Sequence, residues 1–129
     1  MFITNIFFIL SYALPPINHV YSGNVNILLF GKQNIIFKRI EKTTSEIILN
    51  GIINKKGYIY NTENRKNYKL DNNLQNIIDK YKCVIENPIY NNKNDKVIFV
   101  LKIKVLKITK KIQLNNIDKN LDKNNFILK

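Results

Sequence analysis

Histidine, cysteine, arginine and glycine are all scarce in this chain of 129 residues, which has one histidine, one cysteine, two arginines and four glycines. A single cysteine excludes an intramolecular disulfide. The chain contains no glycine-rich phosphate-binding loop, no CxxC pair and no HExxH motif. No Asn-x-Ser/Thr sequence occurs either, so N-glycosylation is not expected. These absences remove the common signatures of nucleotide, redox and zinc sites.

The remaining chemistry-bearing residues do not form a catalytic set. Nine acidic residues are scattered singly, without the polar neighbours that acid–base catalysis needs. Cys83 lies beside Val84 and Ile85, where a buried and inert thiol is the expected state. The sequence therefore predicts a protein that is not an enzyme, with no catalytic residues, no metal site and no cofactor.

Positive charge is what the chain has in excess. The net charge is +12 and the isoelectric point is about 9.8, which points to a polyanionic partner such as nucleic acid or an anionic membrane. However, lysine outnumbers arginine 19 to 2, and arginine is the residue that binds phosphate with two parallel hydrogen bonds. Asparagine, isoleucine and lysine all have A/T-rich codons, so base composition is an alternative source of the charge.

The N-terminal segment is apolar and free of lysine and arginine up to residue 31. Its apolar run of about 14 residues is short for a membrane span, which needs about 20, and matches a signal-peptide core followed by Pro15 and Pro16. Residues 1–22 are interpreted as a signal peptide cleaved after Ser22, which would also remove His19. The alternatives are a retained anchor, with membrane contact through residues 1–14, or a buried element of the domain. The first two place the protein in the secretory pathway, periplasm or extracellular space, and the last in an organelle or the cytosol.

The middle of the chain carries strand patterns separated by turns. Residues 23–44 form a lead-in segment of one or two short strands, and Ile47–Ile53 is a β-branched run typical of a strand. Residues 54–57 then predict a turn in which Gly57 supplies a positive φ, and residues 63–66 a second turn. The strands "YIYN" and "NYKL" follow these turns and complete a three-stranded meander.

The period then changes to that of a helix. Leu74, Ile77, Ile78 and Tyr81 share one helical face, and Asp71 or Asn72 is a natural N-cap. Beyond it, "KCVIENPIY" predicts a strand with an edge or a bulge at Pro88, and "NNKND" predicts a turn.

Residues 97–114, "VIFVLKIKVLKITKKIQL", alternate apolar residues with lysines. Phe99, Leu101 and Ile103 share one face and are predicted to include core positions. Lys102 and Lys104 lie with Ile98 and Val100 on the opposite, solvated face. Beyond Val105 the apolar residues move to even positions, which indicates a β-bulge or a sharp bend. The β-branched residues favour this strand over an amphipathic membrane helix.

The order of three strands, a short helix and two further strands resembles that of small bacterial exported OB-fold proteins, carried by "IILNGIINKKGYIYNTENRKNYKL" and "LQNIIDKYKCVIENPIYNNKNDKVIFVLKIKVLKI". The resemblance, over residues 45–108, departs at Glu86-Asn87-Pro88, where a glycine usually bends the fourth strand. It implies a mostly-β fold, a five-stranded OB-like barrel with one short helix between strands three and four. The expected divisions are the lead-in at 23–44, the barrel at 45–114 and a low-complexity tail at 115–129.

OB-folds bind single strands by stacking bases on aromatic side chains in a positive groove. The corresponding surface here, for a ligand or for nucleic acid, comprises Tyr58, Tyr60, Arg65, Lys66, Tyr68 and Lys69. The other interpretation is that these tyrosines cover the core with their hydroxyls in water. The function favoured by the sequence is an exported or membrane-associated non-enzymatic binding module for a small ligand or a protein partner. The alternative is a basic protein that binds single-stranded nucleic acid.

Overall fold

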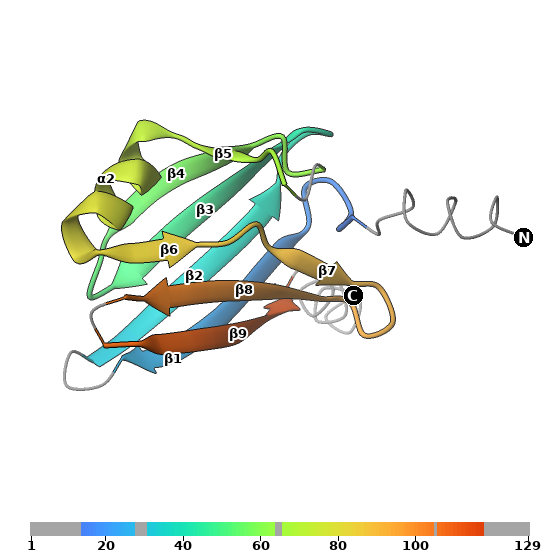
Figure 1. Ribbon diagram of the computed structural model, residues 1–129. Coiled ribbons are helices and arrows are strands. Elements are labelled where there is room, and N and C mark those ends of the chain that lie inside the picture. Colours follow the sequence, from blue (N-terminus) through green and yellow to red (C-terminus); the bar gives the residue numbers. More distant parts are fainter. Residues whose placement is uncertain (1–13, 28–30, 64–65, 105, 118–129) are drawn as a thin grey trace, which may run out of the picture.

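The computed structural model describes residues 14–27, 31–63, 66–104 and 106–117. They form one nine-stranded, wholly antiparallel sheet that curls into a half-barrel, with one helix against its concave side (Figure 1). The strands are β1 (Val20–Ile27), β2 (Gly31–Arg39), β3 (Thr44–Gly51), β4 (Lys55–Tyr60), β5 (Lys69–Leu70), β6 (Cys83–Ile85), β7 (Ile89–Asn91), β8 (Lys96–Ile103) and β9 (Ile108–Asn116), and the helix is α2 (Asn72–Tyr81).

The sheet is mostly a meander. The strand order is β5-β4-β3-β2-β1-β9-β8-β6, and β7 also pairs with β8. The two ends of this order, β5 and β6, do not pair with each other among the described residues, and α2 contacts β4, β5 and β6. The helix therefore spans the gap between the two edges of the curled sheet.

The core lies on the concave face and follows the period-two alternation of the long strands. On β2, Ile35 and Phe37 are buried, and on β8, Val97 and Phe99 are buried. The helix adds Leu74, which is completely buried. The inner face of the sheet and one face of α2 thus enclose a single hydrophobic core.

The helix lies on the predicted stretch, and of the two predicted N-caps Asp71 is the one observed. The Asp71 Oδ1 atom accepts a hydrogen bond from the Leu74 amide at 3.0 Å, which satisfies one of the free N–H groups at the helix start. Lys82 ends the helix in a left-handed conformation with φ 53°, and its amide donates to the Ile78 carbonyl. The helix follows β5, which lies within the predicted third strand "NYKL" but is the fifth strand in chain order.

The mostly-β prediction is confirmed, but the five-strand count is wrong. The segment set apart as a lead-in belongs largely to β1 and β2, which lie in the middle of the sheet, and it contributes Ile35 and Phe37 to the core. The predicted strand around Pro88 divides into β6 and β7, and residues 97–114 form two strands rather than one. The structure is therefore larger and more open than the expected barrel.

The change of phase after Val105 marks a hairpin turn, which is the sharp bend of the two predicted alternatives and not the β-bulge. Ile103 pairs with Ile108 across the turn, and the Lys107 amide donates to the Lys104 carbonyl at 3.2 Å. In a hairpin the chain reverses and forms a second strand beside the first. The inward residues of the second strand can then fall on even positions although those of the first fall on odd ones, as they also would after a bulge. The predicted facing holds for Phe99, which is buried, and for Lys102 and Lys104, which are exposed. Leu101 and Ile103 are half-buried against the core, and Val100, predicted on the solvated face, is also buried.

The turn predicted at residues 54–57 lies three residues earlier. Gly51 has φ 142°, and the Asn54 side chain bonds both the amide and the carbonyl of Gly51 at 3.0 Å. Gly57 is instead a buried residue of β4, where a Cβ atom would lie 2.5 Å from Leu74 Cγ. Its missing side chain allows α2 to approach the sheet, so the glycine has a packing role.

The predicted signal-peptide cleavage site, after Ser22, lies within β1. Tyr21 is completely buried and pairs with Phe37 of β2, so cleavage after Ser22 would remove a core residue. The folded domain includes residues on both sides of that position, and processing itself stays a prediction. Residues 1–13 and 118–129 lie outside the described ranges, whereas Asn115 and Asn116 of the expected tail belong to β9.

Candidate ligand cavity

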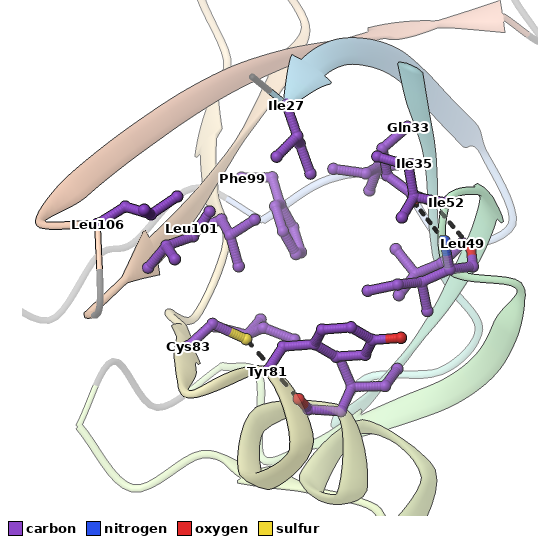
Figure 2. Close-up of a pocket in the computed structure, with 14 residues that line it drawn as sticks. Ile27, Gln33, Ile35, Leu49, Ile52, Tyr81, Cys83, Phe99, Leu101 and Leu106 are labelled. Carbon is purple, nitrogen blue, oxygen red and sulfur yellow. Dashed lines mark hydrogen bonds between the residues drawn. The ribbon is translucent and has the colours of Figure 1, made fainter. Parts of the chain in front are cut away.

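A cavity of about 290 Å³ lies between the concave face of the sheet and α2. Figure 2 shows Phe99 and Ile27 above this space, Leu49 at one side and the Tyr81 ring below it. Apart from Gln33, Cys83 and Tyr81, every residue of the lining has a purely hydrocarbon side chain. The lining residues are Ile27, Gln33, Ile35, Leu49, Ile52, Ile53, Ile77, Tyr81, Cys83, Ile85, Phe99, Leu101, Ile103 and Leu106.

The cavity forms because the inward residues of the curled sheet do not meet across it. On β8, Phe99, Leu101 and Ile103 all point to the concave side, as alternate residues of one strand must. Opposite them, Ile77 and Tyr81 lie four residues apart on one face of α2. The helix holds the two edges of the sheet apart, so the same alternation that builds the core also lines the space.

The cavity opens at one end of the half-barrel. Ile27, Ile53 and Ile103 are only half-buried, and Leu106 is 46% exposed. These residues lie at the strand ends that carry the β1–β2, β3–β4 and β8–β9 connections, on the left in Figure 1. Tyr81, at the C-terminal end of α2, is 42% exposed at the same end. A small molecule could therefore enter between the hairpin turns and the end of the helix.

The most polar residue of the lining is used to hold the fold. The Gln33 amide oxygen accepts from the Ile53 N–H at 2.8 Å, and its nitrogen donates to the Ile53 carbonyl at 3.0 Å. This pair of bonds fixes the turn between β3 and β4 against β2. Because the Gln33 amide is bonded to the Ile53 backbone, Gln33 adds little polar character to the cavity wall.

Cys83, the one thiol of the lining, also offers little reactivity. Burial raises the pKa of the Cys83 thiol, which keeps it protonated and unreactive. The thiol lies 4.0 Å from the Ile77 carbonyl, a weak contact within the wall. The Tyr81 ring has Lys80 Nζ 5.4 Å from its centroid. The inert state expected for Cys83 fits this geometry.

A second cavity of about 160 Å³ lies toward the other end of the half-barrel and is more polar. Its lining includes Leu14, Phe37, Arg39 and Glu63. Among the described residues, Arg39 Nε and Glu63 Oε2 are buried there without a hydrogen-bond partner. Such groups in a space of this size are usually satisfied by ordered water, so we assign this cavity a structural role.

A buried polar cluster joins β1, β7, β8 and β9. The Asp95 carboxylate accepts from the Tyr21 hydroxyl at 2.6 Å, the Tyr90 hydroxyl at 2.8 Å and Asn116 Nδ2 at 2.9 Å. Asn116 Nδ2 also lies 3.0 Å from His19 Nδ1. Burial and the nearby carboxylate raise the pKa of both tyrosines. They remain neutral donors, which is the opposite of an activated nucleophile, so the cluster fixes strands.

The residues of the sequence-predicted surface do not gather on one face. Tyr58 and Tyr60 do share the outer face of β4, opposite the inward Gly57 and Ile59, and Tyr60 is 42% exposed. Tyr68 is half-buried against the core instead, and its hydroxyl donates to the Ile85 carbonyl at 3.0 Å.

The cations of that predicted surface are also dispersed. Lys69 is exposed and pairs with Tyr60 across β4 and β5, and Lys66 is exposed in the preceding connection. Arg65 lies outside the described residues. Lys56 Nζ lies 5.9 Å from the centre of the Tyr58 ring, and Lys56 forms an ion pair with Glu46 at 3.3 Å that raises the pKa of Lys56.

The cavity was not predicted from the sequence. Its walls were visible as inward-facing positions, as at Phe99, Leu101 and Ile103, but an alternating strand reads the same whether its inner face meets another side chain or a cavity. Within the described ranges, no three histidine, cysteine or acidic residues are grouped so as to hold a metal ion. No helix of those ranges combines the length and apolar character needed to cross a bilayer.

Comparisons with protein-family models, with curated proteins and with solved structures found no match to this chain.

Proposed function

We propose that this protein is a non-enzymatic binding module that holds a small, largely apolar molecule between the curled sheet and α2. The observation that carries the proposal is the open cavity of about 290 Å³ with its hydrocarbon wall. Ligand sites are typically concave and mostly apolar, with volumes from roughly 300 Å³ upward. A cavity in a packed core costs stability, and a bound ligand would offset that cost.

The size of the cavity limits the ligand. Engineered apolar cavities of roughly 150 Å³ bind benzene, so this one has space for about two such groups or for a short alkyl chain. Half-exposed residues at its mouth, Ile27 and Ile103 among them, allow a longer ligand to extend into solvent. A compact apolar molecule or a single chain therefore fits better than a large ring system.

A titration with N-phenyl-1-naphthylamine tests the proposal, because its fluorescence rises on entering an apolar site. We expect saturable binding at one site per chain. Leu101→Trp places a large side chain in the cavity and should abolish the signal. Lys102→Trp, one residue along on the exposed face, is the matched control and should bind normally. Equal binding by both variants would locate the probe elsewhere and refute the proposal.

Export is a separate part of the proposal. It is supported by the apolar residues 1–14, which carry no charged side chain. Because Tyr21 is buried in β1, we expect any processing to occur before it. Intact-mass measurement of the protein from its own cells tests where processing occurs. A mature chain that starts at Gly23 would contradict processing before Tyr21.

Binding of single-stranded nucleic acid remains the second candidate. The outward pair Tyr58 and Tyr60 favours it, since both rings lie on one side of β4. Against it, Lys56 beside Tyr58 is already paired with Glu46. We therefore rank this function below ligand binding and test it separately.

A further inference from the structure

Exposed lysines lie in the connections at the end of the half-barrel where the cavity opens, in sequence segments that carry almost no acidic residue. Lys32 and Lys55 are exposed near the starts of β2 and β4, and Lys104 and Lys107 are exposed in the β8–β9 turn. Lys80 and Lys82 lie at the C-terminal end of α2. Among the described residues of these connections and of the last helical turn, Asp79 is the one acidic side chain, and it accepts a hydrogen bond from Gln75.

The opposite end of the half-barrel is different. There each connection combines a lysine with an acidic residue. The pairs are Glu41 with Lys42 between β2 and β3, Glu63 with Lys66 between β4 and β5, and Asp95 with Lys93 between β7 and β8. The described parts of these three turns thus carry one acidic residue for each lysine, although Asp95 is held by Tyr21 and Tyr90 and Glu63 faces the second cavity.

Composition alone does not account for this contrast. A lysine-rich codon bias would place lysines at both ends, and it would not remove acidic residues from one of them. The helix dipole explains part of the pattern, since cations are favoured at a helix C-terminus such as that of α2. It accounts for Lys80 and Lys82, but not for Lys32, Lys55, Lys104 and Lys107.

We propose that the ligand is an anionic amphiphile with a single apolar chain. The chain would occupy the hydrocarbon-lined cavity, and its carboxylate, sulfate or phosphate head would remain at the mouth among the lysines. This inference rests on the proposed function and adds the charge of the ligand to it. The head group would stay hydrated, because the lysines are exposed and interact with it through solvent.

The amphiphile would be a dissolved molecule and not a lipid within a membrane. A membrane-binding face needs apolar side chains that protrude, whereas here the apolar residues line a recess. Among the described residues of the β8–β9 turn, only Leu106 is a large apolar residue that is exposed. A recess takes up one chain at a time, which suits a soluble single-chain ligand.

The test compares three ligands that share an octyl chain and differ in head charge: octyl sulfate, octanol and octyltrimethylammonium. Each is used below its micelle concentration to displace N-phenyl-1-naphthylamine from the full chain. We expect octyl sulfate to bind about three- to tenfold more tightly than octanol at low salt, the range given by one or two exposed ion pairs. Octyltrimethylammonium should bind most weakly, and raising the salt to about 0.15 M should narrow the differences.

Variants locate the charge effect. Lys104→Gln/Lys107→Gln should lose most of the preference for octyl sulfate while still binding N-phenyl-1-naphthylamine. Lys42→Gln/Lys93→Gln removes two lysines from the opposite end and should keep the preference. An equal loss in both double variants would overturn the assignment to the cavity mouth.

The outcomes separate this inference from the proposed function. If octanol and octyl sulfate bind equally well, the cavity binds apolar molecules but the anionic ligand is refuted. If neither these ligands nor N-phenyl-1-naphthylamine binds, the proposed function itself fails. Co-sedimentation with phosphatidylglycerol vesicles that octyl sulfate does not reduce would favour a membrane surface and overturn the free ligand.

Discussion

Replacing Gly57 by alanine tests how closely α2 is seated on the sheet. The added Cβ atom would lie 2.5 Å from Leu74 Cγ and 2.7 Å from Asp71 Oδ1, the atom that caps the helix. Two carbon atoms are in optimal contact at about 3.5–4.0 Å, so the helix must move by roughly 1 Å. Neither partner can yield easily, because Leu74 is completely buried and Asp71 is held by its bond to the Leu74 amide.

The expected cost combines two terms of opposite sign. Overpacking of a core typically costs about 1–3 kcal/mol, whereas glycine within a strand is itself unfavourable by roughly 0.5–1 kcal/mol relative to alanine. We expect Gly57→Ala to lower the free energy of unfolding by about 1–2 kcal/mol. Without the close approach, the same change would be stabilising, so the sign alone distinguishes the two cases.

Urea titration followed by circular dichroism measures the effect. Lys55→Ala, at an exposed position at the start of the same strand, is the control and should change the free energy of unfolding by less than about 0.5 kcal/mol. The double variant Gly57→Ala/Leu74→Ala should be less destabilised than the sum of the single variants, because removing Leu74 removes the clash. Unchanged or increased stability of Gly57→Ala would refute the reasoning, as would strict additivity. Since α2 forms one wall of the cavity, Gly57→Ala should also weaken binding of N-phenyl-1-naphthylamine.

Three further predictions follow from the buried cluster, the N-terminus and the outer face. Since the pKa of Tyr21 is raised in the folded state, the protein should lose stability as the pH rises above about 10, the ordinary tyrosine value. Tyr21→Phe should flatten that dependence in alkaline urea titrations and cost about 1.5–3 kcal/mol near neutral pH by removing a donor to Asp95; an unchanged alkaline profile would contradict this. Deleting residues 1–13 should leave a cooperative unfolding transition, whereas deleting residues 1–22 should abolish it, and a folded shorter form would show that Tyr21 is dispensable. In fluorescence-anisotropy titrations, single-stranded oligonucleotides should bind weakly, more weakly as salt rises, and equally to the Tyr60→Ala variant; a loss of about 1–3 kcal/mol in that variant would support base stacking.

Local patterns in the sequence predicted individual elements well. The helix over Asn72–Tyr81 was predictable because its apolar residues recur at helical spacing and Asp71 precedes it as a cap. The inward facing of Phe99 was predictable for the same kind of reason, since its neighbours at period two are apolar. Both signals depend only on residues within one turn or strand of each other.

The errors arose where one local pattern is compatible with two arrangements. The shift of apolar residues beyond Val105 fits a bulge or a hairpin equally well, and the pairing of Ile103 with Ile108 decides for the hairpin. Gly57 fits a turn or a close contact, and the position of Leu74 decides for the contact. Each decision depends on a contact between two different elements, which the pattern of either element alone does not reveal.

The sequence by itself determined that this chain is mostly β, that one short capped helix interrupts the strands, and that each long strand has an apolar and a polar face. Tertiary structure alone decided that nine strands form one curled sheet and that β5 and β6 remain apart with α2 between them. It also decided that Leu101 faces a cavity and that Lys104 and Lys107 lie at the open end. The physical reason is that alternation fixes only the side of the sheet to which a residue points, whereas the curvature of the sheet and the seat of the helix fix what that residue meets.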